Sequence, residues 1–210
     1  MKSIEDIHLY CFTPGSLSVG RDPLKMVEAE ILGGADVIQL REKEMSKREK
    51  LEFGLKVKDI AHHHGVPFIV NDDVDLAIIL DADGVHLGQD DIPIQYARPL
   101  LGNKIIGVST HSLGQVKKAV EAGADYIGFG PIFETSTKED REEVVGLELL
   151  AELKDICPIP YVAIGGIKKE NLSGVINAGC SRVAVISDIL LADDIEERCK
   201  EIKRQLMQRH

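Results

Sequence analysis

The stretch FIVNDDVDLAIILDADGVHLGQDD, residues 68–91, decides how the rest of the chain is interpreted. Two short apolar runs in it each end in polar residues, NDD at 71–73 after the first and GQDD at 88–91 after the second. The piece between the runs, residues 74–80, is long enough for about two helical turns. The pattern predicts a strand, a helix and a second strand, with carboxylates after each strand.

The two acidic clusters are expected to meet. If the strands are parallel, the right-handed crossover between them places both clusters at the carboxyl end of the sheet. Carboxylate and amide oxygens converging there suit a hard cation such as Mg²⁺, which binds one or two carboxylates together with substrate phosphates. Turn and helix-cap positions are the alternative interpretation, because Asp and Asn favour both. The repetition in consecutive units favours the functional interpretation.

The composition indicates one globular domain that acts on small molecules. The chain has 210 residues, of which 44% are hydrophobic, and it contains no Trp. An Ala-, Val-, Ile- and Leu-rich sequence suits a buried parallel sheet flanked by helices. The formal net charge of -10 argues against a nucleic-acid or anionic-membrane binder. An anionic substrate would then need a local cationic pocket.

The cellular location is predicted from what the sequence lacks. Its four cysteines show no metal-ligand spacing, which is typical of reduced thiols. No apolar run approaches the roughly 20 residues of a membrane span, and the first residues lack the pattern of a signal peptide. We therefore expect a cytoplasmic protein. A homo-oligomer is compatible with the sequence, which leaves the oligomeric state open.

Strand-like runs alternate with helical patterns along the sequence. Strands are predicted at 7–12, 37–40, 68–70, 84–87, 105–108, 126–129, 161–164 and 182–186, and helices at 22–32, 46–64, 74–80, 93–100, 112–122, 146–156, 169–178 and 195–207. Eight such units predict an α/β protein, a single-domain TIM (β/α)8 barrel over residues 1–210. An open doubly wound sheet is the alternative. The lack of a GxGxxG motif after the first strand counts against it.

The helix-to-strand junctions carry a repeated signature. GADV at 34–37, GADY at 123–126 and GCSR at 179–182 each stand where a helix is predicted to lead into a strand, and DADG at 81–84 is a weaker copy. Glycine at a helix end permits a left-handed exit. These turns should lie at the bottom of the barrel, away from any chemistry.

The end of the second strand offers an anion site. Alternation sends Gln39, Arg41 and Lys43 to one side of the strand, and Leu40 and Glu42 to the other. An inward Arg can bind a phosphate through two hydrogen bonds, and Lys adds a point charge. A solvated charged loop is the alternative, and the spacing by two favours the inward arrangement.

Further polar groups follow the later strands. Ser109 and His111 end the fifth strand, although His111 could equally cap the next helix. The loop at 130–140 supplies hydroxyls and a lysine, unless it is simply a polar loop without a task. Glycines and a small serine follow strands seven and eight, at 165–166 and 187. Backbone N–H groups at helix starts there suit a phosphate.

These segments together resemble thiamine-phosphate synthases. The motifs QLREK, VNDDVDLA, GVHLGQDD, GVSTH, GADYIGFGPIFETSTK, VAIGGI and VIS stand in the order found in that family, and the resemblance covers nearly all of the chain from residue 10 to residue 187. The resemblance implies a transferase that joins hydroxymethylpyrimidine diphosphate to hydroxyethylthiazole phosphate, with release of diphosphate. It also implies one Mg²⁺ per subunit.

The resemblance also assigns roles to individual residues. Asp72 and Asp91 are implied as magnesium ligands, and Arg41, Lys43, Ser109 and Lys138 as the groups that act on the diphosphate. The remaining substrate-binding residues implied are Gln39, Leu40, Glu42, Asn71, Thr135, Ser136, Thr137, Gly166, Ile186 and Ser187. Three positions depart from the family pattern: Pro14, Glu134 and Asp188. Asp188 would place a negative charge beside the thiazole phosphate.

Two other functions compete with this one. A thiazole tautomerase on the same barrel would keep the thiazole-phosphate half and lose the diphosphate and metal half. A non-catalytic phosphate-binding barrel would act as a sensor or scaffold. The intact set of Arg41, Lys43, Asp72, Asp91 and Lys138 argues against both.

Overall fold

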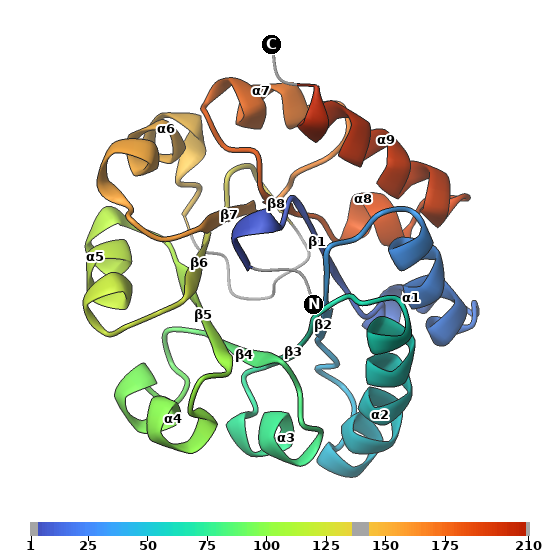
Figure 1. The fold of residues 1–210 in the computed structure, drawn as a ribbon. Coiled ribbons are helices and arrows are strands. Elements are labelled where there is room, and N and C mark those ends of the chain that lie inside the picture. Colours follow the sequence, from blue (N-terminus) through green and yellow to red (C-terminus); the bar gives the residue numbers. More distant parts are fainter. Residues whose placement is uncertain (1–3, 136–142, 209–210) are drawn as a thin grey trace.

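The computed structural model describes residues 4–135 and 143–208. Parallel strands close into a barrel in the order β1 to β8, with helices around it, and the predicted TIM barrel is confirmed (Figure 1). The strands are β1 (Leu9–Phe12), β2 (Val37–Leu40), β3 (Phe68–Asn71), β4 (Gly84–Leu87), β5 (Ile105–Thr110), β6 (Tyr126–Phe129), β7 (Tyr161–Ile164) and β8 (Val183–Ala184).

The eight predicted helices are present among the described residues, together with the short helix α8 and two 3-10 helices. They are η1 (Ile4–Asp6), η2 (Gly15–Ser18), α1 (Pro23–Leu32), α2 (Lys47–His63), α3 (Val74–Ile79), α4 (Ile94–Leu101), α5 (Leu113–Glu121), α6 (Gly146–Ile156), α7 (Leu172–Asn177), α8 (Ser187–Leu190) and α9 (Ile195–Met207). The strand predicted at 182–186 was too long, because the chain turns at Ile186 into α8. That short helix was not predicted, since four residues carry no periodic signal.

Helix ends are set by local chemistry. The side chain of Ser46 accepts a hydrogen bond from the Glu49 amide, and the Glu49 carboxylate accepts one from the Ser46 amide, which forms a capping box at the start of α2. Asp22 and Asp194 cap α1 and α9 by accepting from backbone amides in the first turn. These caps fix where the helices begin, and so how they cover the barrel.

Strand alternation divides the apolar side chains into two cores. Outward residues such as Leu9 and Val85 pack under the helices. Inward residues form a smaller core inside the barrel, which includes Tyr10, Phe12 and Tyr126. The 3-10 helix η1 lies over the centre of the barrel in Figure 1, and its Ile4 packs against this inner core. The amino-terminal end of the barrel is therefore closed, which leaves the carboxyl end for a site.

The repeated junction signature forms a hydrogen-bonded clasp. Asp36, Asp83 and Asp125 precede β2, β4 and β6, and each carboxylate accepts from the backbone amide of a residue in the preceding strand. The donors are Leu9 at 3.0 Å, Phe68 at 2.7 Å and Ile106 at 2.7 Å. Each clasp ties a strand to its neighbour at the bottom of the barrel. This gives the aspartate in these motifs a structural reason.

The glycines of the same signature have the left-handed backbone that was predicted. Gly34, Gly123 and Gly179 have φ values of 103°, 85° and 89°. Asp81, at the matching place in the weaker copy, also has a positive φ of 47°. An L side chain is strained in this region, whereas Asp and Asn tolerate it better than most residues.

The expectations about cysteines and membranes can be compared with the structure. All four cysteines are free thiols, and Cys11, Cys180 and Cys199 are buried. Along residues 4–135 and 143–208, no helix combines the length and the apolar character needed to cross a membrane.

The turn at Gly123 provides a test of the fold. A Cβ at Gly123 would meet nothing within 4 Å, so the cost of a side chain comes from the backbone alone. Gly123→Val should lower the free energy of unfolding by at least about 1–2 kcal/mol and leave the ligand affinity of the folded protein unchanged. Gly123→Asn, the matched control, should lose less. Chemical denaturation and substrate titration measure both; altered affinity at normal stability would contradict this placement.

Candidate active site

A cavity of about 790 Å³ opens at the carboxyl ends of the strands. Most of the site residues expected from sequence line it, namely Gln39, Arg41, Lys43, Asn71, Asp72, Asp91, Ser109, Thr135, Gly166, Ile186 and Ser187. Ser136, Thr137 and Lys138 lie outside the described residues. Residues that follow strands β2 through β8 therefore line one space, as the barrel topology requires.

The run after β2 divides as strand alternation predicts. Arg41 and Lys43 line the cavity, whereas Leu40 packs in the outer core and Glu42 is buried. The carboxylate of Glu42 accepts a hydrogen bond of 3.2 Å from the Gly15 amide. Leu40 and Glu42 were expected to bind substrate, but their side chains do not line this cavity. Glu42 instead ties the β1–α1 loop to the end of β2.

Burial shifts the acid–base properties of this wall. Removal from water lowers the pKa of Arg41, and the nearby carboxylates of Asp72 and Glu42 counteract part of that effect. An arginine stays protonated even when its pKa falls somewhat, because the ordinary pKa of a guanidinium lies far above neutral pH. Arg41 therefore brings a fixed positive charge to the cavity.

The acidic pair lies beside this arginine. Asp72 has a left-handed backbone with φ of 62°, and its amide donates to the His86 carbonyl at 2.8 Å. Partial loss of water and the neighbouring Asp91 carboxyl raise the pKa of Asp72 to about 6, against the pull of Arg41. Asp91 itself accepts a 2.6 Å hydrogen bond from the Gly88 amide. Strained, mutually repelling acids are characteristic of functional sites.

Asp73, the next residue, is turned away from the cavity. Its carboxylate lies 2.9 Å from Lys50 Nζ and 3.3 Å from Lys47 Nζ, both on α2. These ion pairs neutralise Asp73 and anchor the loop that carries Asp72. Of the three consecutive polar residues after β3, Asn71 and Asp72 therefore serve the cavity and Asp73 holds the loop.

The opposite wall is built from backbone. Gly165 and Gly166 follow β7 with φ values of 97° and 61°, and Ile186 and Ser187 follow β8. A Cβ at Gly166 would lie 2.5 Å from the Glu134 carbonyl oxygen, so only glycine fits between these loops. Small residues here bring the main chain to the edge of the cavity.

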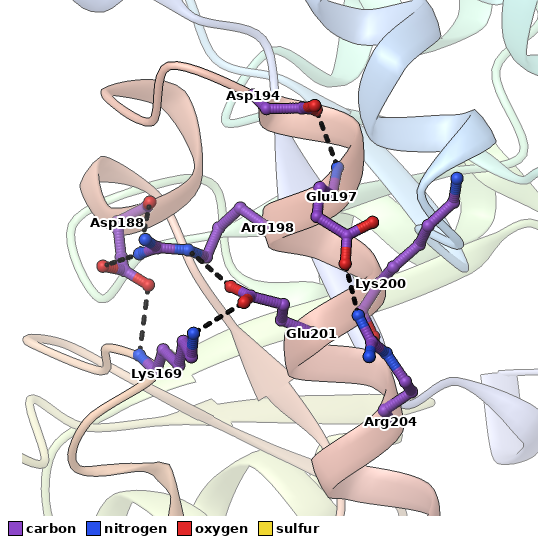
Figure 2. A network of polar contacts seen from close by, with 8 residues as sticks. All are labelled: Lys169, Asp188, Asp194, Glu197, Arg198, Lys200, Glu201 and Arg204. Atoms are coloured by element: carbon purple, nitrogen blue, oxygen red, sulfur yellow. Dashed lines mark hydrogen bonds and ion pairs between the residues drawn. The ribbon is translucent and has the colours of Figure 1, made fainter.

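Asp188 does not lie in the cavity, despite following Ser187. Figure 2 shows its carboxylate turned toward α9, where one oxygen lies 2.7 Å from Arg198. The other oxygen accepts a 3.1 Å hydrogen bond from the Lys169 amide, and Glu201 bridges the Lys169 and Arg198 side chains. The extra charge is therefore neutralised away from Ser187. The network also joins the loops after β7 and β8.

His111 contributes to the wall and does not cap a helix. Ser112 is the N-cap of α5, since its side chain accepts from the Gln115 amide. The His111 ring lines the cavity with Nδ1 placed 2.5 Å from the Gly130 carbonyl oxygen. Its position keeps the ring close to the loop after β6.

Sequence reasoning missed the polar residues at the base of the cavity. His86, Tyr10 and Tyr126 line it, and His86 Nε2 lies 2.9 Å from the Ser109 hydroxyl. A signal was present in the strand period, because His86 stands two residues after Gly84 and so shares its inward face. This signal is hard to recognise, because His86, Tyr10 and Tyr126 each stand among apolar residues in the sequence of their strands.

The residues present fit a hard cation only in part. Within residues 4–135 and 143–208, no three His, Cys, Asp or Glu side chains gather as metal ligands. The Asp72 and Asp91 carboxyls do lie together, and their repulsion is what a bound cation would relieve. Two carboxylates match the way Mg²⁺ binds when substrate phosphates supply other ligands. The fold and cavity together define a (β/α)8-barrel enzyme of small molecules.

The chain belongs to the thiamine monophosphate synthase family, whose sequence profile matches residues 9–189. The thiamine-phosphate synthase of Chloroflexus aurantiacus is 46% identical over 200 residues, covering 95% of this chain and 93% of that protein. That of Halalkalibacterium halodurans is 43% identical over 207 residues, covering 98% of each. These relatives are transferases of thiamine biosynthesis.

Solved structures agree with the family assignment. Thiamine phosphate pyrophosphorylase from Pyrococcus furiosus matches with a TM-score of 0.88 and 36% identity, over 97% of this chain and 98% of that one. The 3-hexulose-6-phosphate synthase of Salmonella typhimurium matches with a TM-score of 0.73 at 18% identity, which reflects the fold alone.

The two neighbouring aspartates should respond oppositely to neutralisation. Asp72→Asn removes the repulsion with Asp91 and keeps a residue that tolerates a left-handed backbone, so it should stabilise the chelator-treated protein by up to about 1 kcal/mol. Asp73→Asn loses the ion pairs with Lys47 and Lys50 and should destabilise it by a similar amount. Thermal melts at neutral pH measure both. A lower melting temperature for Asp72→Asn would refute the repulsion.

Proposed function

We propose that this chain is a thiamine-phosphate synthase that joins hydroxymethylpyrimidine diphosphate to hydroxyethylthiazole phosphate and releases diphosphate. The observation that carries the proposal is one cavity with two kinds of wall: charged side chains from the ends of β2 to β4, and exposed backbone after β7 and β8. The names of the relatives support the same activity.

The charged wall suits the pyrimidine diphosphate. Arg41 offers paired N–H donors to phosphate oxygens, and Lys43 adds a second positive charge. Gln39 and Asn71 add amide groups at the deeper end of this wall. By the family resemblance, Lys138 completes the set from the loop after β6. These residues would hold the diphosphate and neutralise the charge that it gains on leaving.

Asp72 and Asp91 would hold Mg²⁺ on the same wall. Bound there, the ion would supply positive charge to the diphosphate as a Lewis acid. Asp73 keeps the loop of Asp72 in place through its ion pairs with α2. The carboxylate pair therefore stays at the cavity edge beside Arg41.

The backbone wall suits the thiazole phosphate. The Gly165–Gly166 turn and the chain at Ile186 and Ser187 bring main-chain groups to the cavity edge. Thr135 lies on the same cavity, and the family pattern adds Ser136 and Thr137. Arg198 of α9 binds the Asp188 carboxylate and holds it away from the cavity, so this wall is open to an anion.

The chemistry needs orientation and charge neutralisation rather than proton transfer. The bond between the pyrimidine methylene carbon and the diphosphate oxygen breaks, and its electron pair leaves with the diphosphate. The electron-rich aminopyrimidine stabilises the cation that remains, and the lone pair of the thiazole nitrogen forms the new carbon–nitrogen bond. The protein binds both substrates with these atoms in line and excludes water from the cation.

The rival functions make different demands on the cavity. A tautomerase would need only the thiazole-phosphate wall, and a sensor would need no leaving-group site. The charged wall with Arg41, Asp72 and Asp91 has no task in either.

The deciding experiment incubates the purified chain with both substrates and Mg²⁺ and measures thiamine phosphate and diphosphate by chromatography. If neither thiamine phosphate nor diphosphate forms, although the protein still binds both substrates, the synthase function is rejected.

Metal removal gives the first prediction from this proposal. EDTA should abolish coupling, and added Mg²⁺ or Mn²⁺ should restore it, because the two carboxylates need a cation to accept a diphosphate. Full activity after treatment with chelating resin would remove the metal role from Asp72 and Asp91. Calorimetric titration of Mg²⁺ with inorganic diphosphate present gives a second measurement that is independent of turnover.

The two walls should be separable by mutation. Arg41→Ala removes a charged hydrogen bond worth roughly 1.5–3 kcal/mol and should weaken an unreactive pyrimidine diphosphate analogue about ten- to a hundred-fold. Ser187→Asp adds a negative charge and should weaken the thiazole phosphate instead. Arg48→Ala, on the exposed side of α2, and Ser187→Ala are the controls. Calorimetry with each ligand measures the effects; equal loss of both ligands in both variants would indicate one shared phosphate site.

A further inference from the structure

A continuous chain of hydrogen bonds crosses the base of the cavity. Gln39 Nε2 donates to the Tyr10 hydroxyl over 2.8 Å, and the Tyr10 and Tyr126 hydroxyl oxygens are 2.9 Å apart. Tyr126 lies 2.9 Å from His86 Nδ1, and His86 Nε2 lies 2.9 Å from Ser109 Oγ. Five strands, β1, β2, β4, β5 and β6, each contribute one member of this chain.

The amide of Gln39 sets the direction of the chain. An amide nitrogen can only donate, so the Tyr10 oxygen accepts from it. Among the contacts of the described residues, the Tyr10 hydroxyl has one other hydrogen-bonding neighbour, Tyr126, and its hydrogen therefore goes there. The Tyr126 hydroxyl then donates to His86 Nδ1.

This direction fixes the tautomer of His86. Because Nδ1 accepts, a neutral imidazole carries its proton on Nε2. His86 Nε2–H then donates to the Ser109 oxygen, and the hydroxyl hydrogen of Ser109 is left to point elsewhere. Ser109 lines the cavity, so that hydrogen is available to a ligand.

The tyrosines are suited to this task because they remain neutral. Tyr10 and Tyr126 are 2% and 1% exposed, and burial raises the pKa of both phenols above their ordinary value. Each hydroxyl therefore keeps its hydrogen at any physiological pH. A phenolate in either place would accept hydrogen bonds only and would reverse the chain.

Two glycines make room for the network. A Cβ at Gly107 would lie 2.1 Å from the Tyr126 ring, and one at Gly128 would lie 3.4 Å from the His86 ring. The register places Gly107 beside both His86 and Tyr126, and Gly128 beside Ser109. The missing side chains of these two glycines thus leave the space that the Tyr126 and His86 rings occupy. This complementarity indicates that the network has a fixed geometry.

We propose that Tyr10 and Tyr126 are positioning residues that hold His86 in the Nε2–H tautomer, so that the Ser109 hydroxyl donates its hydrogen to the diphosphate of the substrate. The identity of that ligand rests on the proposed function, whereas the direction of the chain rests on the geometry alone. With the opposite tautomer, Ser109 would donate to His86 and turn lone pairs toward the anion. Under the proposal, the two tyrosines affect catalysis only through Ser109.

The first test measures the tautomer directly in the unmodified protein. Two-bond nitrogen–proton correlation spectra of histidine-labelled protein distinguish a bare ring nitrogen from a protonated one. The His86 signals are assigned by their loss in His86→Gln. A bare Nδ1 and a protonated Nε2 are expected for His86. A protonated Nδ1 would overturn the proposal, whatever reaction the enzyme catalyses.

The second test asks whether Tyr126 acts through Ser109. Tyr126→Phe and Ser109→Ala should each weaken binding of magnesium diphosphate about ten-fold, as expected for loss of one hydrogen bond to a charged group. The double variant should be no weaker than Ser109→Ala alone. Independent, multiplying effects would overturn the proposal. Tyr96→Phe, on the exposed side of α4, is the matched control and should bind normally.

Two further measurements separate positioning from a general structural effect. In Tyr126→Phe, the His86 spectrum should show a mixture of tautomers, while the affinity for thiazole phosphate stays unchanged. If Tyr126→Phe keeps the Nε2–H tautomer of His86 but loses diphosphate binding, the mechanism is contradicted. If diphosphate binding and the tautomer behave as expected but no thiamine phosphate forms, the proposed function fails and the positioning role stands.

Discussion

Closure of the barrel is the constraint on which the rest of the structure depends. Once eight parallel strands pair in a ring, every second residue of each strand enters one narrow interior. Large side chains there require empty positions opposite them, and Gly107 leaves the space that the Tyr126 ring occupies. The size of one inward side chain is therefore set by its neighbours on adjacent strands. Packing and the geometry of the cavity are consequences of the same ring.

The two ends of the barrel use acidic residues in opposite ways. At the bottom, the carboxylates of Asp83 and Asp125 accept backbone amide hydrogens and stabilise the strand junctions. At the top, the Asp72 and Asp91 carboxyls lie beside each other; partial loss of water and the neighbouring Asp91 raise the pKa of Asp72, although Asp91 itself accepts a hydrogen bond from the Gly88 amide. In a chain with a net charge of -10, the mutually repelling carboxyls of Asp72 and Asp91 therefore lie where a bound cation would stabilise them. Function at the top depends on stability built elsewhere.

Much of the barrel could be predicted from the sequence, because strand and helix periods and the glycine turns are local signals. The inward set of Gln39, Arg41 and Lys43 followed from alternation along a single strand. The role of Asp73 did not, since its lysine partners lie on α2. Neither did the outward turn of Asp188, which depends on Arg198 in α9, or the chain through His86 and Tyr126. Contacts between distant elements set these positions, and no local pattern records them.

The hydrogen-bonded clasps at the bottom of the barrel bear on where the chain could begin and end. Asp36, Asp83 and Asp125 each join two strands that are consecutive in sequence, so every clasp is contained in a unit of two strands. The turns at 64–67, 102–104 and 157–160 lie between such units and on the face away from the cavity. New termini opened at those turns would cut no clasp and touch no part of the cavity. A circularly permuted chain that begins at one of those turns should therefore keep each aspartate on the same segment as its backbone donor.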